Sequence, residues 1–132
     1  MIPVLVDCDP GLDDALALLL VLASPELELL GVTTVAGNQT VDKTTANALR
    51  VLELAGRGDV LVARGVDRPL MGELVVAADA HGDSGLGGLV LPEPKSEPAK
   101  EHAVDFLAER LLGAERPITL IALGPLTNLA LL

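Results

Sequence analysis

The chain has 132 residues, half of them apolar, and a net charge of −10. This composition predicts one globular domain with a sizeable core, and the acidic balance argues against a surface for nucleic acid or anionic membranes. The longest apolar run, residues 15–23, is too short to span a bilayer, no signal peptide is visible, and a single cysteine fits a reducing cytosol, so we expect a cytoplasmic protein.

Four aspartates stand close together near the N-terminus, between two apolar runs. Residues 2–6 have the length and β-branching of a short buried strand, and residues 15–23 have the length of a helix. This helix is apolar all round, so it should be covered on several sides. The end of the strand and the start of the helix carry the four carboxylates Asp7, Asp9, Asp13 and Asp14. In an open α/β sheet, ligands bind at such strand ends.

The order of residue types predicts the local geometry of this acidic stretch. Side chains alternate along a strand, so Asp7 and Asp9 should lean to one side and Cys8, a small buried hydrophobe, to the other. Asp9 is a suitable N-cap and Pro10 a suitable first helical residue. The plainest interpretation is that the acids only cap the helix, but four crowded carboxylates raise one another's pKa. A bound cation would relieve that conflict, and oxygen-only ligands favour Ca²⁺ or Mg²⁺.

The rest of the chain alternates between strands and helices. The predicted strands are residues 27–35, 60–63 and 118–123, and the predicted helices are residues 41–55, 99–112 and the segment from 124 onward. This alternation predicts an α/β fold with an open, mainly parallel, Rossmann-like sheet and flanking helices. Residues 65–91 lack periodicity and include a glycine-rich loop. Because the chain stops inside an apolar helix, we expect it to be truncated, with residues 1–132 forming the N-terminal part of a single domain.

Four motifs along the chain suggest a family. They are DCDPGLDD at residues 7–14, TTVAGNQT at 33–40, HGDSG at 81–85 and LGPLTN at 123–128. Together they resemble the N-terminal portion of the inosine-uridine preferring nucleoside hydrolase family. The resemblance implies hydrolysis of the N-glycosidic bond of a ribonucleoside, which gives ribose and a free base. Carboxylates favour the oxocarbenium-like transition state of such a reaction.

The resemblance also implies a metal site and a base. Ca²⁺ would be held partly by the carboxylates of Asp9 and Asp14 and by the backbone carbonyl of Leu123. Asp9 would in addition be the general base that activates the metal-bound water. Further ligands and the groups near the leaving base belong to a C-terminal region in this family, so we expect residues 1–132 alone to be inactive. We expect the complete protein to be a homo-oligomer.

Three polar residues are candidates for contacts with the substrate. The resemblance implies that Asp13 and Asn38 bind ribose hydroxyls. His81, in the glycine-rich loop, could face the site as an acid or ribose contact, or could be an exposed loop residue. Asn128 follows a helix start signal and could be only a capping or turn residue.

Two functions from other classes remain open. A phosphatase-like hydrolase could use the Asp-x-Asp pair after the first strand, with Asp7 as nucleophile and Asp9 as acid and base. A non-catalytic interaction module could keep the half-sheet and pair with another chain. Phosphate release with Mg²⁺ would indicate the former, and an exposed apolar face without metal affinity the latter.

Overall fold

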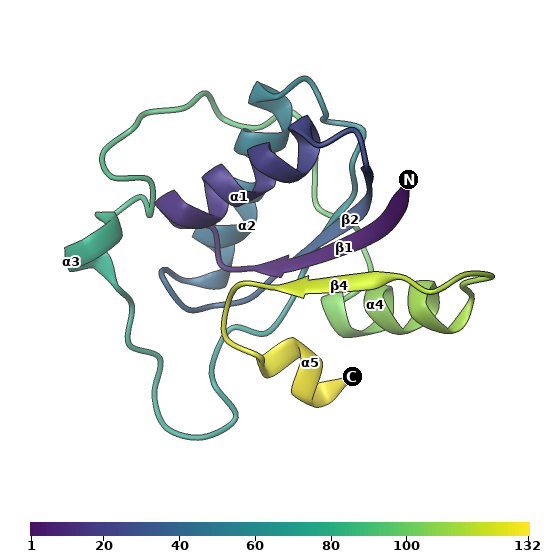
Figure 1. Ribbon diagram of the computed structural model, residues 1–132. Coiled ribbons are helices and arrows are strands. Elements are labelled where there is room, and N and C mark those ends of the chain that lie inside the picture. Colours follow the sequence, from purple (N-terminus) through teal and green to yellow (C-terminus); the bar gives the residue numbers. More distant parts are fainter.

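The computed structural model describes residues 1–132 as a four-stranded sheet with helices on both faces (Figure 1). The strands are β1 (Ile2–Cys8), β2 (Leu27–Thr34), β3 (Val62–Arg64) and β4 (Thr119–Ala122), and the helices are α1 (Leu12–Ala23), α2 (Val41–Leu54), α3 (Ala78–His81), α4 (Ala103–Leu112) and α5 (Thr127–Leu131). The strand order is β3-β2-β1-β4 and every pair is parallel. This confirms the predicted α/β class and the parallel sheet.

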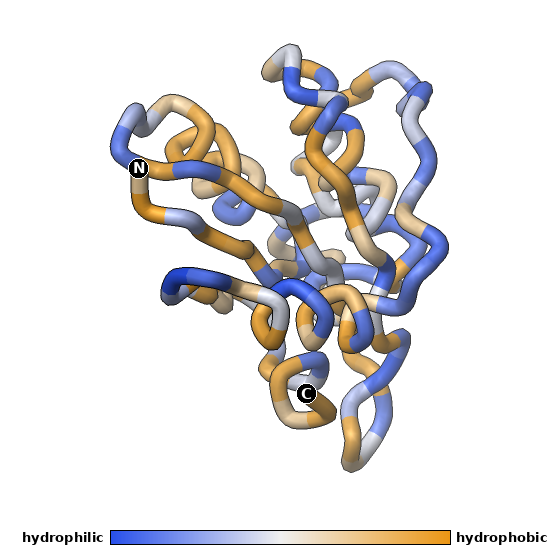
Figure 2. The backbone as a smooth tube through the Cα atoms, turned by 90° about the vertical axis from the view of Figure 1, so that its right-hand side faces the viewer, coloured by the Kyte–Doolittle hydropathy of each residue, from blue (hydrophilic) through white to orange (hydrophobic).

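The central strand β1 supplies both hydrophobic cores because its side chains alternate between the two faces of the sheet. Val4, Val6 and Cys8 belong to the larger core, under α1 and α2. Leu5 belongs to the smaller core, where it lies with the buried Phe106 of α4. Figure 2 shows hydrophobic residues mainly along the strands and helices, and hydrophilic residues mainly in the connecting loops. No helix combines the length and the hydrophobicity that a membrane-spanning segment requires.

The N-cap of α1 is Gly11, two residues after the Asp9 that the sequence predicted. The expectation that Asp9 caps the helix and that Pro10 opens it is therefore wrong. The carboxylate of Asp9 is engaged elsewhere, because its Oδ2 accepts a hydrogen bond from the backbone N–H of Asn38 at 2.7 Å. The free N–H of Gly11 donates instead to Oδ2 of Asp14, at 3.3 Å. The acid in the first helical turn thus satisfies the helix end, as the dipole favours.

Helix α1 is also less covered than its composition predicted. Leu18 is fully buried, but Leu16 and Leu20 are 68% and 69% exposed. The sheet and α2 pack on only one side of α1. Within residues 1–132, the expectation that α1 is covered on several sides is therefore wrong. An all-apolar sequence does not specify which face is buried, because every face has the same hydrophobicity.

Two further differences concern the second half of the chain. Helix α4 starts at Ala103 rather than at residue 99, and His102 is its N-cap, with Nδ1 accepting from the N–H of Val104 at 3.3 Å. The short helix α3 lies within the stretch predicted to be loop. The other predicted elements are present, with ends shifted by one or two residues as is usual for boundaries read from sequence, except that α5 begins at Thr127 rather than at residue 124.

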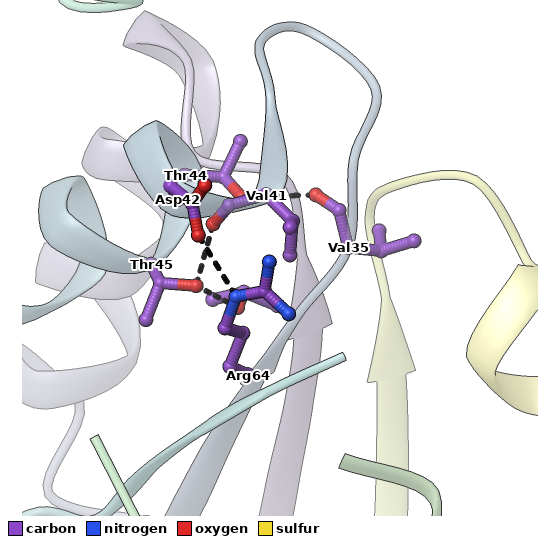
Figure 3. A network of polar contacts seen from close by, with 7 residues as sticks. Val35, Val41, Asp42, Thr44, Thr45 and Arg64 are labelled. Carbon is purple, nitrogen blue, oxygen red and sulfur yellow. Dashed lines mark hydrogen bonds and ion pairs between the residues drawn. The ribbon is translucent and has the colours of Figure 1, made fainter. Parts of the chain in front are cut away.

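A polar network anchors the start of α2 to the sheet (Figure 3). The hydroxyl of Thr44 donates to the carbonyl of Val35 at 3.0 Å, and Asp42 pairs with Arg64 at 2.9 Å. These contacts join α2 to the ends of β2 and β3. The segment between β2 and α2, which contains Asn38, is therefore held at both ends.

The same substitution should have different effects on stability on the buried and on the exposed side of α1. Leu18→Ala should lower the free energy of unfolding by about 2–5 kcal/mol, because it leaves a cavity in the larger core. Leu16→Ala, the same change on the exposed side, should stay within about 0.5 kcal/mol of the wild type. Urea unfolding followed by circular dichroism measures both values. Equal losses in the two variants would show that both faces of α1 are buried in solution.

Candidate active site

The motif residues converge at the carboxyl ends of three neighbouring strands. Asp7 is near the end of β1, where it pairs in register with Thr33 of β2 and with Ala122 of β4. Leu123 follows β4, and its N–H donates to the carbonyl of Asp7 at 2.8 Å. Asn38 follows β2. In Figure 1 the arrowheads of β1 and β4 point towards this edge, on the side of the molecule where α3 lies.

Asp9 is enclosed by backbone. Its carboxylate accepts from the N–H of Asn38, and the amide of the Asn38 side chain donates to the carbonyl of Asp9 at 3.1 Å. A Cβ added at Gly37 would collide with Oδ2 of Asp9, and one added at Gly124 would lie 2.7 Å from Oδ1. Only glycine fits at these two positions. Asp9 is consequently 5% exposed and is fixed from both sides.

Asp14 is buried with one oxygen unsatisfied. Its Oδ2 accepts from the N–H of Gly11 and from the side-chain amide of Asn38, both at 3.3 Å. Its Oδ1 is buried and has no hydrogen-bond partner. Asp13, the preceding residue on α1, is exposed. Asn38 thus bridges Asp9 and Asp14, while Asp13 remains open to a ligand.

Burial raises the pKa of the acids in this cluster. Burial is the largest cause for Asp9, whose pKa rises to about 6, and the neighbouring charge of Asp14 adds to it. The pKa of Asp7 and that of Asp14 are raised as well, again chiefly by burial. The predicted direction is confirmed, but loss of solvent contributes more than repulsion between carboxylates. Burial and the same three acids also raise the pKa of the Cys8 thiol, as expected for an inert, buried cysteine.

His81 lies against the acidic turn rather than in open solvent. Its Nδ1 accepts from the N–H of Leu12 at 3.2 Å, and a Cβ added at Gly11 would collide with the imidazole ring. Because Nδ1 is an acceptor, the neutral ring carries its proton on Nε2. The half-buried His81 therefore keeps an N–H donor available beside the acidic cluster.

The sequence interpretation missed two partners of Asp7. Oδ1 of Asp7 accepts from the hydroxyl of Thr33 at 2.5 Å and from the side-chain amide of Asn128 at 2.8 Å. The same amide donates to the carbonyl of Thr34 at 3.0 Å, while Oδ1 of Asn128 accepts from the N–H of Val66 at 3.1 Å. Asn128 is thus a buried link between four segments, and not merely a turn residue. In-register pairing of β1 with β2 would have predicted Thr33, but the position of α5 has no local signal.

The oxygen atoms at this edge suit a hard cation, but they provide only part of its coordination shell. No three His, Cys, Asp or Glu side chains lie close enough together to hold a metal ion. Asp9 and the unsatisfied Oδ1 of Asp14 offer carboxylate oxygens, and the carbonyl of Leu123 is in the adjacent strand end. Ca²⁺ takes about six to eight oxygens, so these residues would fit the ion without completing its coordination.

The fold and the motif positions agree with one family. The family model of inosine-uridine preferring nucleoside hydrolases matches residues 4–132. The chain belongs to this family, as the resemblance predicted.

Curated relatives and solved structures give the same result. A pyrimidine-specific ribonucleoside hydrolase RihA from Photobacterium profundum is 56% identical over 130 residues, which cover 98% of this chain and 42% of the relative. A plant nucleoside hydrolase, PpNRh1, matches with a TM-score of 0.92 at 42% identity over 98% of this chain and 41% of its own. A purine-preferring ribonucleoside hydrolase from Gardnerella vaginalis matches with a TM-score of 0.92 at 32% identity, over 97% and 42%. The chain spans about two-fifths of the length of the curated relatives it matches.

The raised pKa of Asp9 predicts how stability depends on pH. Between its ordinary value near 4 and about 6, the native state keeps a proton on Asp9 that the unfolded chain has released. The retained proton stabilises the native state at low pH. This stabilisation is lost as the pH rises through that window, so the free energy of unfolding falls. Asp9→Asn should remove it, so the variant should gain stability relative to the wild type as the pH rises. Urea unfolding in chelator-containing buffer measures this difference, and a difference independent of pH would contradict the raised pKa.

Proposed function

We propose that this chain forms the metal- and ribose-binding part of a ribonucleoside hydrolase, as the N-terminal part of a single domain. The reaction is hydrolysis of the N-glycosidic bond to ribose and free base. The observation that carries the proposal is the buried pair Asp9 and Asp14, with an unsatisfied Oδ1 on Asp14, at the edge of a nucleoside hydrolase sheet. Two buried carboxylates side by side are unfavourable unless a positive group compensates them.

The proposed metal is Ca²⁺, held by Asp9, Asp14 and the carbonyl of Leu123. When bound, the ion supplies positive charge to the acidic cluster and orients water. Asp9 is the proposed general base. Its Oδ2 is occupied by the N–H of Asn38, so Oδ1 is the oxygen that can accept a proton from water. The positive charge of the ion would favour the ionised form of the Asp9 carboxylate, and a base that takes a proton from water must be ionised.

The proposed ribose contacts are Asp13 and Asn38. Asp13 is exposed at the start of α1, and the amide of Asn38 lies between Asp9 and Asp14. His81, with its proton on Nε2, is the proposed hydrogen-bond donor to the substrate. The negative charge of this cluster favours the positive charge that develops on the ribosyl ring. We expect water to attack once, with inversion, since no further carboxylate is placed to form a covalent intermediate.

The substrate is proposed to be a small ribonucleoside rather than a nucleic acid. The names of the relatives that are 52–56% identical favour a pyrimidine base, so uridine is the first substrate to test and inosine the second. We propose a cytoplasmic location and a homo-oligomer for the complete protein, with no membrane partner.

The geometry of Asp7 speaks against the phosphatase-like alternative. Asp7 is fully buried, and its Oδ1 already accepts from Thr33 and Asn128. A nucleophile must reach the substrate, and this carboxylate is held inside the sheet edge. The interaction-module alternative does not account for the clustering of Asp9, Asp14 and Asn38.

The test of the proposal is ribose release with saturating Ca²⁺. Residues 1–132 alone should release none from uridine or inosine. A chimaera in which they replace the matching two-fifths of the Photobacterium profundum relative should be active. Asp9→Asn in the chimaera should lower turnover by about a hundredfold or more, because it keeps the shape and removes the proton acceptor. Asp105→Asn, on the exposed side of α4, is the matched control and should have wild-type turnover. Near wild-type turnover by the Asp9 variant would exclude Asp9 as the base.

The metal assignment has a separate test. Asp14→Ala in the chimaera should lose tight Ca²⁺ binding, because it removes the only unsatisfied buried oxygen of the α1 turn. Isothermal titration calorimetry measures the affinity, and Asp105→Ala is the control. An unchanged Ca²⁺ affinity in the Asp14 variant would refute its role as a ligand.

A further inference from the structure

Three side chains at intervals of four residues donate hydrogen bonds to residues 82–88, the part of the glycine-rich loop that follows His81. The side-chain amide of Gln39 donates to the carbonyl of residue 82 at 3.1 Å, and Lys43 Nζ donates to that of residue 83 at 2.6 Å. The side-chain amide of Asn47 donates to the carbonyl of Ser84 at 2.8 Å. Lys43 and Asn47 are four residues apart on one face of α2, and Gln39 lies just before the helix, so the three donors bind three successive carbonyls of the loop.

Asn47 differs from the other two because it also reaches the acidic turn. It is fully buried, and the same side-chain nitrogen donates to the carbonyl of Pro10 at 3.2 Å. Its Oδ1 accepts from Nη1 of Arg50 at 3.2 Å. Arg50 thereby fixes the orientation of the amide, with the nitrogen towards the two carbonyls. One buried side chain therefore joins the glycine-rich loop to the turn that contains Asp9 and Asp14.

The backbone of the loop lies close to the side chain of Asn47 at Gly85. Gly85 has φ of +84°, and a Cβ added there would lie 2.9 Å from the side-chain nitrogen of Asn47. Gly88 has the same φ of +84°, but a Cβ added there would meet nothing within 4 Å. The two glycines thus share one backbone strain and differ in contact with Asn47. The N–H of Gly87 donates to the carbonyl of His81 at 2.8 Å, so the loop position determines where His81 sits.

We propose that Asn47 is a positioning residue that fixes the glycine-rich loop to the acidic turn and so holds His81 beside Leu12. The effect on substrate binding rests on the proposed function, in which His81 contacts the substrate. The effect on the loop itself does not. Loss of the Asn47 contacts should release the loop while leaving the sheet and its acidic cluster in place.

The first test measures the loop in the 132-residue chain without substrate or metal. Asn47→Asp keeps the shape but turns a carboxylate oxygen towards the two carbonyls, which removes both hydrogen bonds. Amide hydrogen exchange at Gly85 and Gly87 should become at least about tenfold faster, while exchange in β1 stays as in the wild type. Lys43→Ala, which removes an exposed contact to the same loop, is the control and should change these rates by less than about threefold. Wild-type exchange at both glycines in the Asn47 variant would overturn the proposal.

The second test approaches the contact from the loop, where misfolding of the core is not a concern. Gly85→Ala and Gly88→Ala introduce the same strain, because both glycines have the same φ. Only Gly85→Ala displaces Asn47, so only this variant should reproduce the faster exchange of Asn47→Asp. Equal acceleration in the two alanine variants would show that backbone strain, and not the Asn47 contact, controls the loop.

The third test asks whether the loop position matters for substrate. If the competent loop falls to about a tenth of the population, the apparent KM for uridine rises about tenfold. In the chimaera, Asn47→Asp and Gly85→Ala should raise KM in this way with kcat changed by less than about threefold, and Gly88→Ala should not. Unchanged KM despite faster exchange would refute the positioning role. An inactive unsubstituted chimaera would count against the proposed function alone, since the exchange experiments would still decide whether Asn47 holds the loop.

Discussion

The unfavourable burial of three carboxylates, at the end of β1 and in the first turn of α1, determines the arrangement of the whole site. Asp7, Asp9 and Asp14 are each at most 5% exposed, and burial raises the pKa of all three. Buried acids persist only where donors reach them. Here the donors come from the adjacent strand β2, from the segment before α2, from α5 and from the N–H of Gly11 in the same turn. The parallel sheet is the framework that brings these donors to one edge.

Much of this edge could be predicted from the sequence, because parallel strands end at the same side of a sheet. The strand-helix alternation placed Asp9, Asp14 and Asn38 at two such ends, and the structure joins them by hydrogen bonds. Their roles towards metal and ribose remain predictions. The order of the strands was not predictable. That β4 lies beside β1, and so brings Leu123 and Asn128 to the acidic cluster, depends on packing between distant segments.

Other features were predicted wrongly or not at all, and each has a physical reason. The start of α1 was misplaced because Asp9 has the composition of a cap, yet a distant backbone N–H competes for its carboxylate. The exposed side of α1 was missed because its sequence is apolar in every direction. Asn47 stands inside a helix, where asparagine is an ordinary if unfavourable residue. Its partners are 37 residues away in both directions, so no local pattern could reveal them.

With Asp9 as the proposed base, the two glycines that pack against its carboxylate have a consequence beyond their shape. Gly37 and Gly124 bring main chain against both carboxylate oxygens, and this leaves the side chain little rotational freedom. The entropy of ordering Asp9 is therefore lost when the sheet folds, and not at each encounter with a substrate. A group that is already oriented contributes to rate acceleration through proximity alone. The residues with no side chains are thus the ones that keep the proposed base in a single orientation.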